Sequence, residues 1–272
     1  MGAEWREWLD GFDRELVAAG RPESTRKLRA YHIRRFADEH PGRTPADITR
    51  DDLIEWLSAH QSWSPEYRRS LRASLRLFYR WAQMTERIAR DPAATLPPIT
   101  PPPSMPRPAP DFALTTALTV RDPRTHLMIE LIANTGIRRA ECACVHSRDV
   151  VDDLIGFSLR VTGKGGKQRM VPMPDHLARQ VRAANGWVFP GQINGHLSPR
   201  RVGELVADAL PGEWTAHTLR HRYATRAYAL SKDIRAVQEL LGHSKVETTQ
   251  RYIKVADDTL RSVAQQVWAS AA

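Results

Sequence analysis

Four polar side chains near the end of the chain have the types and spacing needed for chemistry on a phosphate group. His217 and Arg220 are three residues apart, so a helix would place them on one face. The planar fork of an arginine guanidinium suits two phosphate oxygens. His243 closes a Leu-Leu-Gly-His run, and Tyr252 follows nine residues later with a hydroxyl that becomes a nucleophile once activated. The sequence therefore predicts a phosphate-directed histidine–arginine pair together with a candidate tyrosine nucleophile.

Length and composition indicate a globular protein of two modest domains. The chain has 272 residues, of which 42% are hydrophobic. It contains no run of about 18 apolar residues, which argues against a membrane span. Its first residues are acidic and amphipathic, unlike a signal peptide, so we expect a cytoplasmic protein that binds no membrane. Cys142 and Cys144 have neither disulfide-framework nor zinc-site spacing, and we expect both to be small buried residues.

The chain is strongly basic, with a formal net charge of +9 and a pI of about 10.0. Most of the excess positive charge falls in residues 96–272. A polyanion such as nucleic acid is the partner that this charge favours, although many basic proteins bind none.

Hydrophobic spacing predicts four helices in the N-terminal part of the chain and hence a compact helical bundle. The expected helices cover residues 4–19, a segment opened by Pro22 or Ser24, a short segment around residues 53–57, and residues 64–87. The tryptophans and Tyr31 have core spacing, so we expect them to pack inside the bundle rather than stack on bases.

The fourth of these helices carries a stripe of arginines. The stripe consists of Arg68, Arg72, Arg76 and Arg80, with Arg69 beside it. A solvated helix face is the ordinary interpretation of such a stripe. Because only Glu66 opposes it between residues 64 and 82, we favour a surface that faces DNA phosphates.

Prolines divide the chain into two parts. Eight of them lie between Pro97 and Pro110, a segment that cannot form a helix and that we expect to be an extended linker. The predicted domains are therefore 1–96, a helical bundle, and 111–272, with 97–110 between them.

The second domain is expected to be mainly helical with a small β-hairpin or sheet. Helices are expected over 112–133, from Ile137 onward and over 198–209, and Thr215 is expected to cap the helix of His217. Strands are expected at residues 150–151, 155–161 and 169–173, with a glycine-rich turn that puts Lys164 at its tip.

With these motifs in order, the chain resembles a tyrosine recombinase of the phage-integrase and Xer type over nearly its whole length. Four motifs carry the resemblance: Thr135-Gly136-Ile137-Arg138 with Glu141, the hairpin from Val161 to Pro172, His217-Thr218-Leu219-Arg220-His221, and Leu240-Leu241-Gly242-His243 followed by Tyr252. The resemblance implies a two-domain, C-shaped clamp. Its N-terminal helical bundle would be a SAM-like core-binding domain, and its C-terminal part the catalytic domain.

The resemblance also implies roles for six side chains. Arg138 and Arg220 would hold the phosphate, with His243 as a hydrogen-bond donor. Tyr252 would attack phosphorus to form a 3′-phosphotyrosine, and Lys164 would protonate the leaving 5′-oxygen, with Lys167 as its closest rival. His217 would accept and return the tyrosine proton. This scheme needs neither ATP nor a metal, so no cofactor is expected.

The expected function is site-specific recombination of double-stranded DNA at a core site by a tetramer on two sites, with directionality factors as further partners. Integration or excision of a phage or mobile element is favoured, because Ala140, Cys142 and Arg222 depart from the usual motifs. The first domain starts almost at Met1, which leaves no room for an arm-binding domain. Xer-type dimer resolution, a type IB topoisomerase and a catalytically idle DNA-binding regulator are the alternatives. The tail after Tyr252 is expected to dock on a neighbouring protomer, with docking on its own domain as the alternative.

Overall fold

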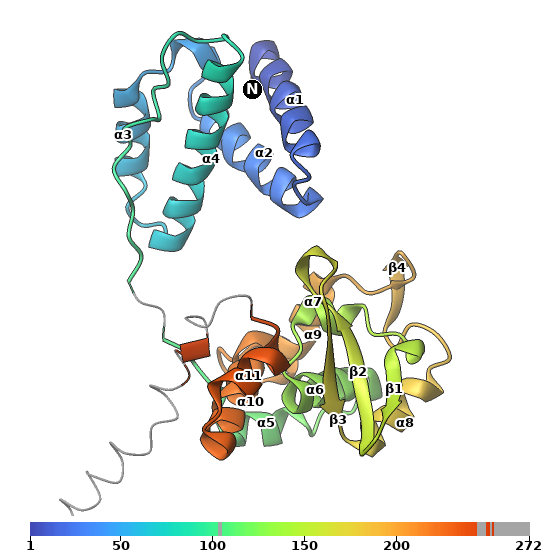
Figure 1. The fold of residues 1–272 in the computed structure, drawn as a ribbon. Helices are drawn as coiled ribbons and strands as arrows, with labels where there is room; N and C mark the ends of the chain where they lie inside the picture. The colour runs from blue at the N-terminus through green and yellow to red at the C-terminus, as the bar shows by residue number, and fades with distance from the viewer. Residues whose placement is uncertain (103–104, 244–248, 251, 253–272) are drawn as a thin grey trace, which may run out of the picture. The chain divides into compact units, whose positions relative to one another are not determined.

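The computed structural model describes residues 1–102, 105–243, 249, 250 and 252, with the exception of the Lys164 side chain. The chain forms two compact units, Met1–Ser104 and Met105–Ala272, and each has its own core (Figure 1). The division between them falls inside the proline-rich segment 97–110. Helices dominate and three strands form one antiparallel sheet, which confirms the predicted fold class.

The first unit is a bundle of four helices. These are α1 (Ala3–Ala18), α2 (Glu23–Asp38), α3 (Arg50–Ala59) and α4 (Pro65–Met84), with a short 3-10 helix at Pro45–Asp47 between α2 and α3. Serine and threonine caps open the later helices: Thr49 Oγ1 accepts from Asp52 N, and Ser64 Oγ accepts from Tyr67 N. The fourth helix ends at Met84, three residues before the expected end.

Aromatic rings fill the core of this bundle. Trp5 stacks on Phe78 with ring centroids 6.0 Å apart, and Phe12 meets Phe78 edge-on at 5.5 Å. The tryptophans at positions 5, 8 and 56 are buried, as expected. Tyr31 is 52% exposed, so its predicted packing role is wrong: the buried face of α2 runs through His32, Ile33 and Phe36.

The second unit packs helices around a three-stranded sheet. Its helices are α5 (Asp111–Ala117), α6 (Pro123–Thr135), α7 (Arg139–Ala143), α8 (Asp175–Ala183), α9 (Pro199–Ala209), α10 (Ala216–Ser231) and α11 (Ile234–Leu241), with 3-10 turns at Ser147–Asp149 and Lys164–Gly166. The strand order is β1-β2-β3, and both pairs are antiparallel. Helix α8 lies against β1 and β2, whereas α6 and α11 contact β3. A short fourth strand, β4 (Pro190–Ile193), lies apart from this sheet.

The sheet forms the hairpin that the sequence predicts. Strands β1 (Val150–Asp153), β2 (Gly156–Thr162) and β3 (Gln168–Met173) follow the expected segments closely. Val161 pairs with Arg169, and the backbone N–H of Gly163 donates to Lys167 O at 2.8 Å, which closes the turn that carries Lys164. The expected single helix at 112–133 is wrong, because Asp122 caps a new helix at Pro123.

Two glycines end the helices that precede the Arg138 and His243 motifs of the second unit. Gly136 ends α6 with φ of 62°, and Gly242 ends α11 with φ of 62°, a left-handed conformation that glycine adopts without strain. Space requires glycine at both positions as well. A Cβ on Gly136 would lie 2.3 Å from Tyr223 Cδ1, and one on Gly242 would lie 2.9 Å from Arg169 Cδ.

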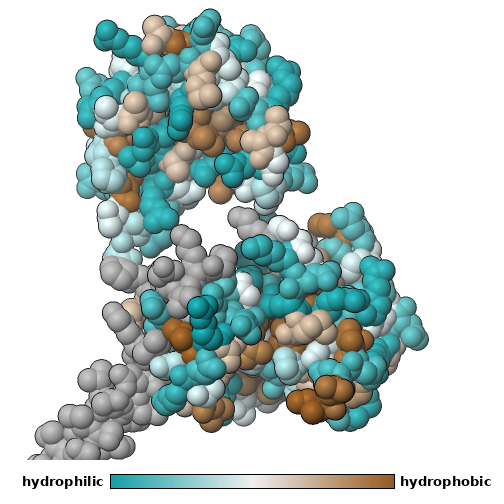
Figure 2. Space-filling model, in the orientation of Figure 1, coloured by the Kyte–Doolittle hydropathy of each residue, from teal (hydrophilic) through white to brown (hydrophobic). Residues whose placement is uncertain are grey.

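The two cysteines differ in exposure. Cys142 is fully buried in the core of the second unit, as expected, but Cys144 is exposed and its predicted burial is wrong. Cys144 is the C-cap residue of α7, and its Sγ lies 3.5 Å from His196 Nε2. Hydrophilic side chains cover most of the visible face of each unit (Figure 2). Among the described residues, no helix combines the length and the apolar character that a membrane crossing requires.

Candidate active site

A buried carboxylate organises the first part of the site. The side chain of Glu141, only 5% exposed, accepts from Arg138 N at 2.7 Å and from Arg138 Nη1 at 2.8 Å. Arg169 on β3 donates to both carboxylate oxygens, with Nη1 at 3.0 Å and Nη2 at 2.8 Å. Burial alone would raise the pKa of Glu141, but the hydrogen bonds from Arg169 and Arg138 outweigh it and lower that pKa to about 2. Glu141 is therefore ionised at neutral pH.

Arg220 is the most deeply buried cation of the site, at 2% exposure. Its guanidinium donates to Gly136 O at the end of α6 and, at 2.7 Å, to Leu241 O at the end of α11. The terminal carbonyls of a helix carry partial negative charge, which offsets the loss of water around the guanidinium. Burial and the charge of Arg138 lower the pKa of Arg220 to about 10, so it remains protonated at neutral pH.

His243 lies between Arg220 and a threonine. Its Nε2 is 3.1 Å from Arg220 Nη2, and its Nδ1 is 2.9 Å from Thr249 Oγ1. A guanidinium only donates, so Nε2 accepts and the ring proton sits on Nδ1. Burial and the charges of Arg220, Arg138 and Arg169 lower the pKa of His243 to about 3. In this arrangement His243 is an acceptor, and donation to a phosphate requires the other tautomer.

Tyr252 lies among histidine rings. It is 3% exposed, and its ring is parallel to that of His243 with centroids 6.3 Å apart. The ring centroid of His221 is 5.5 Å from that of Tyr252 and 4.2 Å from that of His217. Desolvation and the charges of Arg220 and Arg138 lower the pKa of His217, which therefore favours the neutral, proton-accepting form. The rings of His217, His221, Tyr252 and His243 thus form a continuous series of contacts.

The structure brings five of the six predicted catalytic residues together. Arg138 Nη2 donates to Gly242 O at 3.4 Å, which connects the Arg138 motif to the His243 motif. Arg220 contacts Leu241 O and His243 in the same motif. The sixth, Lys164, begins the 3-10 turn between β2 and β3, and its side chain is outside what the structure describes. Lys167, its rival, is exposed on the same turn.

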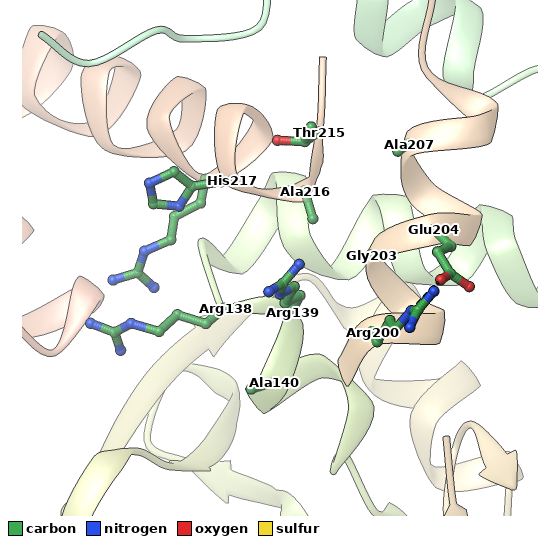
Figure 3. A pocket seen from close by; sticks show the side chains of 11 residues that line it. Arg138, Arg139, Ala140, Arg200, Gly203, Glu204, Ala207, Thr215, Ala216 and His217 are labelled. Carbon is green, nitrogen blue, oxygen red and sulfur yellow. Dashed lines mark hydrogen bonds and ion pairs between the residues drawn. The ribbon is translucent and has the colours of Figure 1, made fainter. Parts of the chain in front are cut away.

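A pocket of about 700 Å³ opens beside these residues. Arg138 and His217 line one wall, and Arg200 and Glu204 of α9 line the other, with Arg139 between them (Figure 3). Arg220 also lines the pocket. The cationic side chains along this pocket suit a negatively charged ligand. Within the described ranges, no three His, Cys, Asp or Glu side chains gather closely enough to hold a metal ion.

The predicted DNA-binding arginines of α4 differ in their surroundings. Arg68 Nη2 donates to Leu57 O at 3.1 Å and Arg72 Nε donates to Leu96 O at 3.2 Å, so both are half-buried and tie α4 to neighbouring segments. Arg69, Arg76 and Arg80 are exposed.

Arg222, a departure from the usual motif, points toward α5. Its Nε donates to Asp111 Oδ1 at 3.1 Å, and its side chain is 13% exposed. The other departures are equally local, since Ala140 lines the pocket and Cys142 packs in the core. None of the three displaces the predicted catalytic side chains.

Sequence reasoning did not assign any site role to Arg169, His221 or Thr249. Arg169 was only a residue of an expected strand, and its contacts span 28 residues to Glu141 and 71 to Leu240. His221 is one helical turn from His217 on α10, a spacing that could have indicated a shared face. Thr249 offers no comparable signal, because its contact with His243 depends on the tertiary structure.

Comparison with known proteins links the chain to a family. The phage integrase family profile matches residues 113–259. The tyrosine recombinase XerC of Xanthomonas campestris pv. campestris is 34% identical over 274 residues, which cover 90% of this chain and 77% of that protein. The tyrosine recombinase XerA of Thermococcus kodakarensis is 30% identical over 283 residues, covering 97% of this chain and 96% of that protein.

Solved structures share the fold. A lambda integrase dimer bound to a COC′ core site superposes with a TM-score of 0.74 at 20% identity, covering 93% of this chain and 95% of that one. The XerH recombinase bound to a palindromic difH substrate gives a TM-score of 0.69 at 18% identity, with coverage of 90% and 80%. At these identities the similarity is one of fold.

Proposed function

Because this chain belongs to the phage integrase family of tyrosine recombinases, enzymes that cut and rejoin DNA, we propose that it acts through the six residues Arg138, Lys164, His217, Arg220, His243 and Tyr252. One observation carries this proposal. Tyr252 stacks on His243, whose Nε2 is 3.1 Å from the buried guanidinium of Arg220. A candidate nucleophile and a fixed cation thus both contact one histidine.

In the proposed reaction, the scissile phosphate binds between Arg138 and Arg220. Negative charge builds up on its non-bridging oxygens as Tyr252 attacks, and the preorganised guanidiniums stabilise that charge more than they stabilise the ground state. The phosphorus–oxygen bond to the 5′-oxygen breaks as the bond to the tyrosine oxygen forms. The DNA then carries a 3′-phosphotyrosine, and the reverse attack by a 5′-hydroxyl restores the phosphodiester.

Two protons move in this step. The tyrosine hydroxyl loses one, and His217 is the proposed acceptor because its lowered pKa keeps it neutral. The leaving 5′-oxygen gains one, and Lys164 on the β2–β3 turn is the proposed donor. Because the covalent intermediate conserves the phosphodiester energy, the scheme uses no nucleotide cofactor.

A trapping experiment tests the proposal. The binding sequence is first selected from random duplexes, and a nicked version of that duplex then lets the cleaved strand diffuse away so that the covalent complex accumulates. The wild-type protein is expected to accumulate this complex and Tyr252→Phe to accumulate none. Equal trapping by both proteins would show that the nucleophile is wrong, and no trapping by the wild type would reject the proposed chemistry.

We propose integration or excision of a mobile element as the biological role, which the motif departures favour. The names of the relatives, XerC and XerA, favour a second candidate, resolution of chromosome or plasmid dimers. The selected duplex separates the two. Its presence at an attachment site beside the gene supports integration, whereas a single copy in the chromosome far from any mobile element supports dimer resolution.

The proposed partners are double-stranded DNA with a specific core site and three further copies of the chain. A lambda integrase tetramer bound to a Holliday junction has the same fold as this chain, which supports such an assembly. The first unit is the proposed core-binding domain and the second the catalytic one. The predicted docking of the tail concerns residues 253–272, which lie outside the described residues, and strand cleavage by a chain cut after Val255 tests it.

A further inference from the structure

Arg169 contacts three of the segments that carry the proposed catalytic residues. It lies at the base of the hairpin whose turn bears Lys164, and it pairs with Val161 across β2 and β3. Its Nη1 and Nη2 donate to Glu141, which binds the backbone and the guanidinium of Arg138. Its Nε donates to Leu240 O at 2.9 Å, three residues before His243. With 11% of its side chain exposed, Arg169 has little access to solvent.

The neighbouring glycines leave space for this side chain. A Cβ on Gly242 would lie 2.9 Å from Arg169 Cδ and 3.1 Å from its Nη1. A Cβ on Gly163 would lie 3.6 Å from Glu141 Oε1 and 3.8 Å from Arg169 Nη1. The Arg169–Glu141 pair therefore fills the gap between the base of the hairpin and the end of α11.

The Arg169–Glu141 ion pair affects the charge available on the two proposed phosphate-binding arginines. Glu141 is one buried negative charge beside three guanidiniums, those of Arg138, Arg169 and Arg220, the last at 3.9 Å. Arg169 occupies both carboxylate oxygens in a bidentate pair, the strongest geometry for this contact. Arg138 already shares this carboxylate through its Nη1 at 2.8 Å. Without Arg169, the full charge of Glu141 would fall on Arg138 and Arg220 and neutralise charge that the phosphate needs.

We propose that Arg169 is a positioning residue for the strand-transfer reaction: it neutralises Glu141 so that Arg138 and Arg220 remain available to the phosphate, and it fixes the lysine hairpin against the end of α11. This inference rests on the proposed function. It assigns Arg169 no contact with DNA.

The test compares Arg169→Met with Arg182→Met. Arg182 is a matched control, since it also pairs with an acid, Asp152, and lies over an aromatic ring, Phe157, but joins α8 to the strands β1 and β2. At saturating nicked duplex, Arg169→Met is expected to form the covalent complex about 10- to 100-fold more slowly than wild type, the scale of a misplaced catalytic group. Its dissociation constant for the duplex should stay within about twofold, and Arg182→Met should match wild type in both.

Two further variants separate positioning from simple loss of structure. Arg169→Lys keeps the charge but not the bidentate pair, so it should recover part of the rate. Glu141→Gln removes the charge that Arg169 neutralises, so adding Arg169→Met to it should slow the reaction much less than the same change does in wild type. Equal slowing in both backgrounds would overturn the proposal.

The pH profile gives an independent readout. Loss of Arg169 raises the pKa of Glu141 from its lowered value, and protonation of Glu141 removes the same charge that Glu141→Gln removes. The ratio of the wild-type rate to the Arg169→Met rate should therefore shift toward one as the pH falls. This shift should be absent in Glu141→Gln. If the wild type forms the complex while Arg169→Met forms it equally fast at every pH, the inference fails and the proposed function stands. If the wild type forms none, the proposed function fails first.

Discussion

Individual side chains of the site are held mostly by backbone groups at helix ends. Arg220 donates to the carbonyls at the ends of α6 and α11, and the backbone N–H of Arg138 donates to the Glu141 carboxylate. Backbone acceptors at these positions are fixed by the helices themselves, so they cost little reorganisation when charge develops on a bound phosphate. The cationic site is therefore rigid because backbone carbonyls at the ends of α6 and α11 hold Arg220.

Replacing Arg220 with lysine tests this dependence. A lysine ammonium lacks the planar fork and cannot reach both carbonyls and His243 at once. We expect Arg220→Lys to slow covalent-complex formation by about 100-fold or more, as for loss of one oxyanion donor. Single-turnover trapping on the nicked duplex measures this rate. Arg222→Lys on the same helix, whose partner is Asp111, is the control and should retain a rate close to wild type.

The ends of helices determine where several of the motif residues lie. The N-cap of α7 is Arg138, that of α10 is Thr215, and the glycines after α6 and α11 release the chain toward the site. Helix ends therefore lie next to Arg138, His217 and His243. Changes at these ends should affect stability and geometry together.

Gly136→Ala provides a direct measure, with Gly212→Ala as its control. Both glycines have positive φ, 62° and 65°, but a Cβ on Gly136 meets Tyr223 at 2.3 Å whereas one on Gly212 meets nothing within 4 Å. The left-handed conformation alone costs alanine about 1 kcal/mol. Gly136→Ala adds overpacking and should lower the free energy of unfolding by about 3 kcal/mol in total. Denaturant unfolding measures both, and equal losses would contradict the steric argument.

The contact between α2 and α4 should make the first unit sensitive to acid. His32 is fully buried, and its Nδ1 lies 2.7 Å from Ser74 Oγ. Burial and the charges of Arg29 and Arg35 lower its pKa from 6.5 to about 4. The folded state thus holds His32 neutral, and stability present above pH 6.5 is lost as pH falls toward 4, by about 3 kcal/mol at most. Hydrogen exchange of α2 and α4 at pH 7 and pH 5 should reveal this loss, and His32→Gln should reduce it.

For the whole molecule, positive charge is the property that bears on DNA binding. The chain carries 40 lysines and arginines against 31 acids, so association with DNA should weaken steeply with salt. The exposed arginines of α4 are the proposed contribution of the first unit. Arg68 and Arg72 have the same charge but donate hydrogen bonds to the backbone carbonyls of Leu57 and Leu96.

This difference predicts two outcomes within one stripe. Arg69→Gln, Arg76→Gln and Arg80→Gln should each weaken binding and reduce the salt slope by about 1, because each removes one phosphate contact. Arg68→Gln and Arg72→Gln should instead lower the unfolding free energy of the first unit with little change in slope. Titrations of labelled duplex at several salt concentrations measure the slope. Equal slopes for all five variants would contradict the division.

Local patterns of the chain were sufficient for several helices and for the hairpin, but not for the break between α5 and α6. Apolar residues at helical spacing placed α1, α3 and α9, and the glycine-rich turn placed β2 and β3, because periodicity and turn chemistry act over a few residues. The failures were also local. Tyr31 and Cys144 have apolar neighbours in the sequence, but the face turned to the core depends on which helix or strand packs there.

The motifs from Arg138 to Tyr252 could be read from residue types and order, since each occupies a short continuous stretch. Their mutual geometry could not. Arg169 reaches Glu141 across 28 residues and Leu240 across 71, and Arg220 reaches Gly136 across 84. Such contacts exist only after α6, α10, α11 and the sheet have packed, because burial of their apolar faces fixes the distances between their ends. The sequence thus determines which chemical groups are present, whereas the charge balance around Glu141 depends on how the helices and the sheet pack.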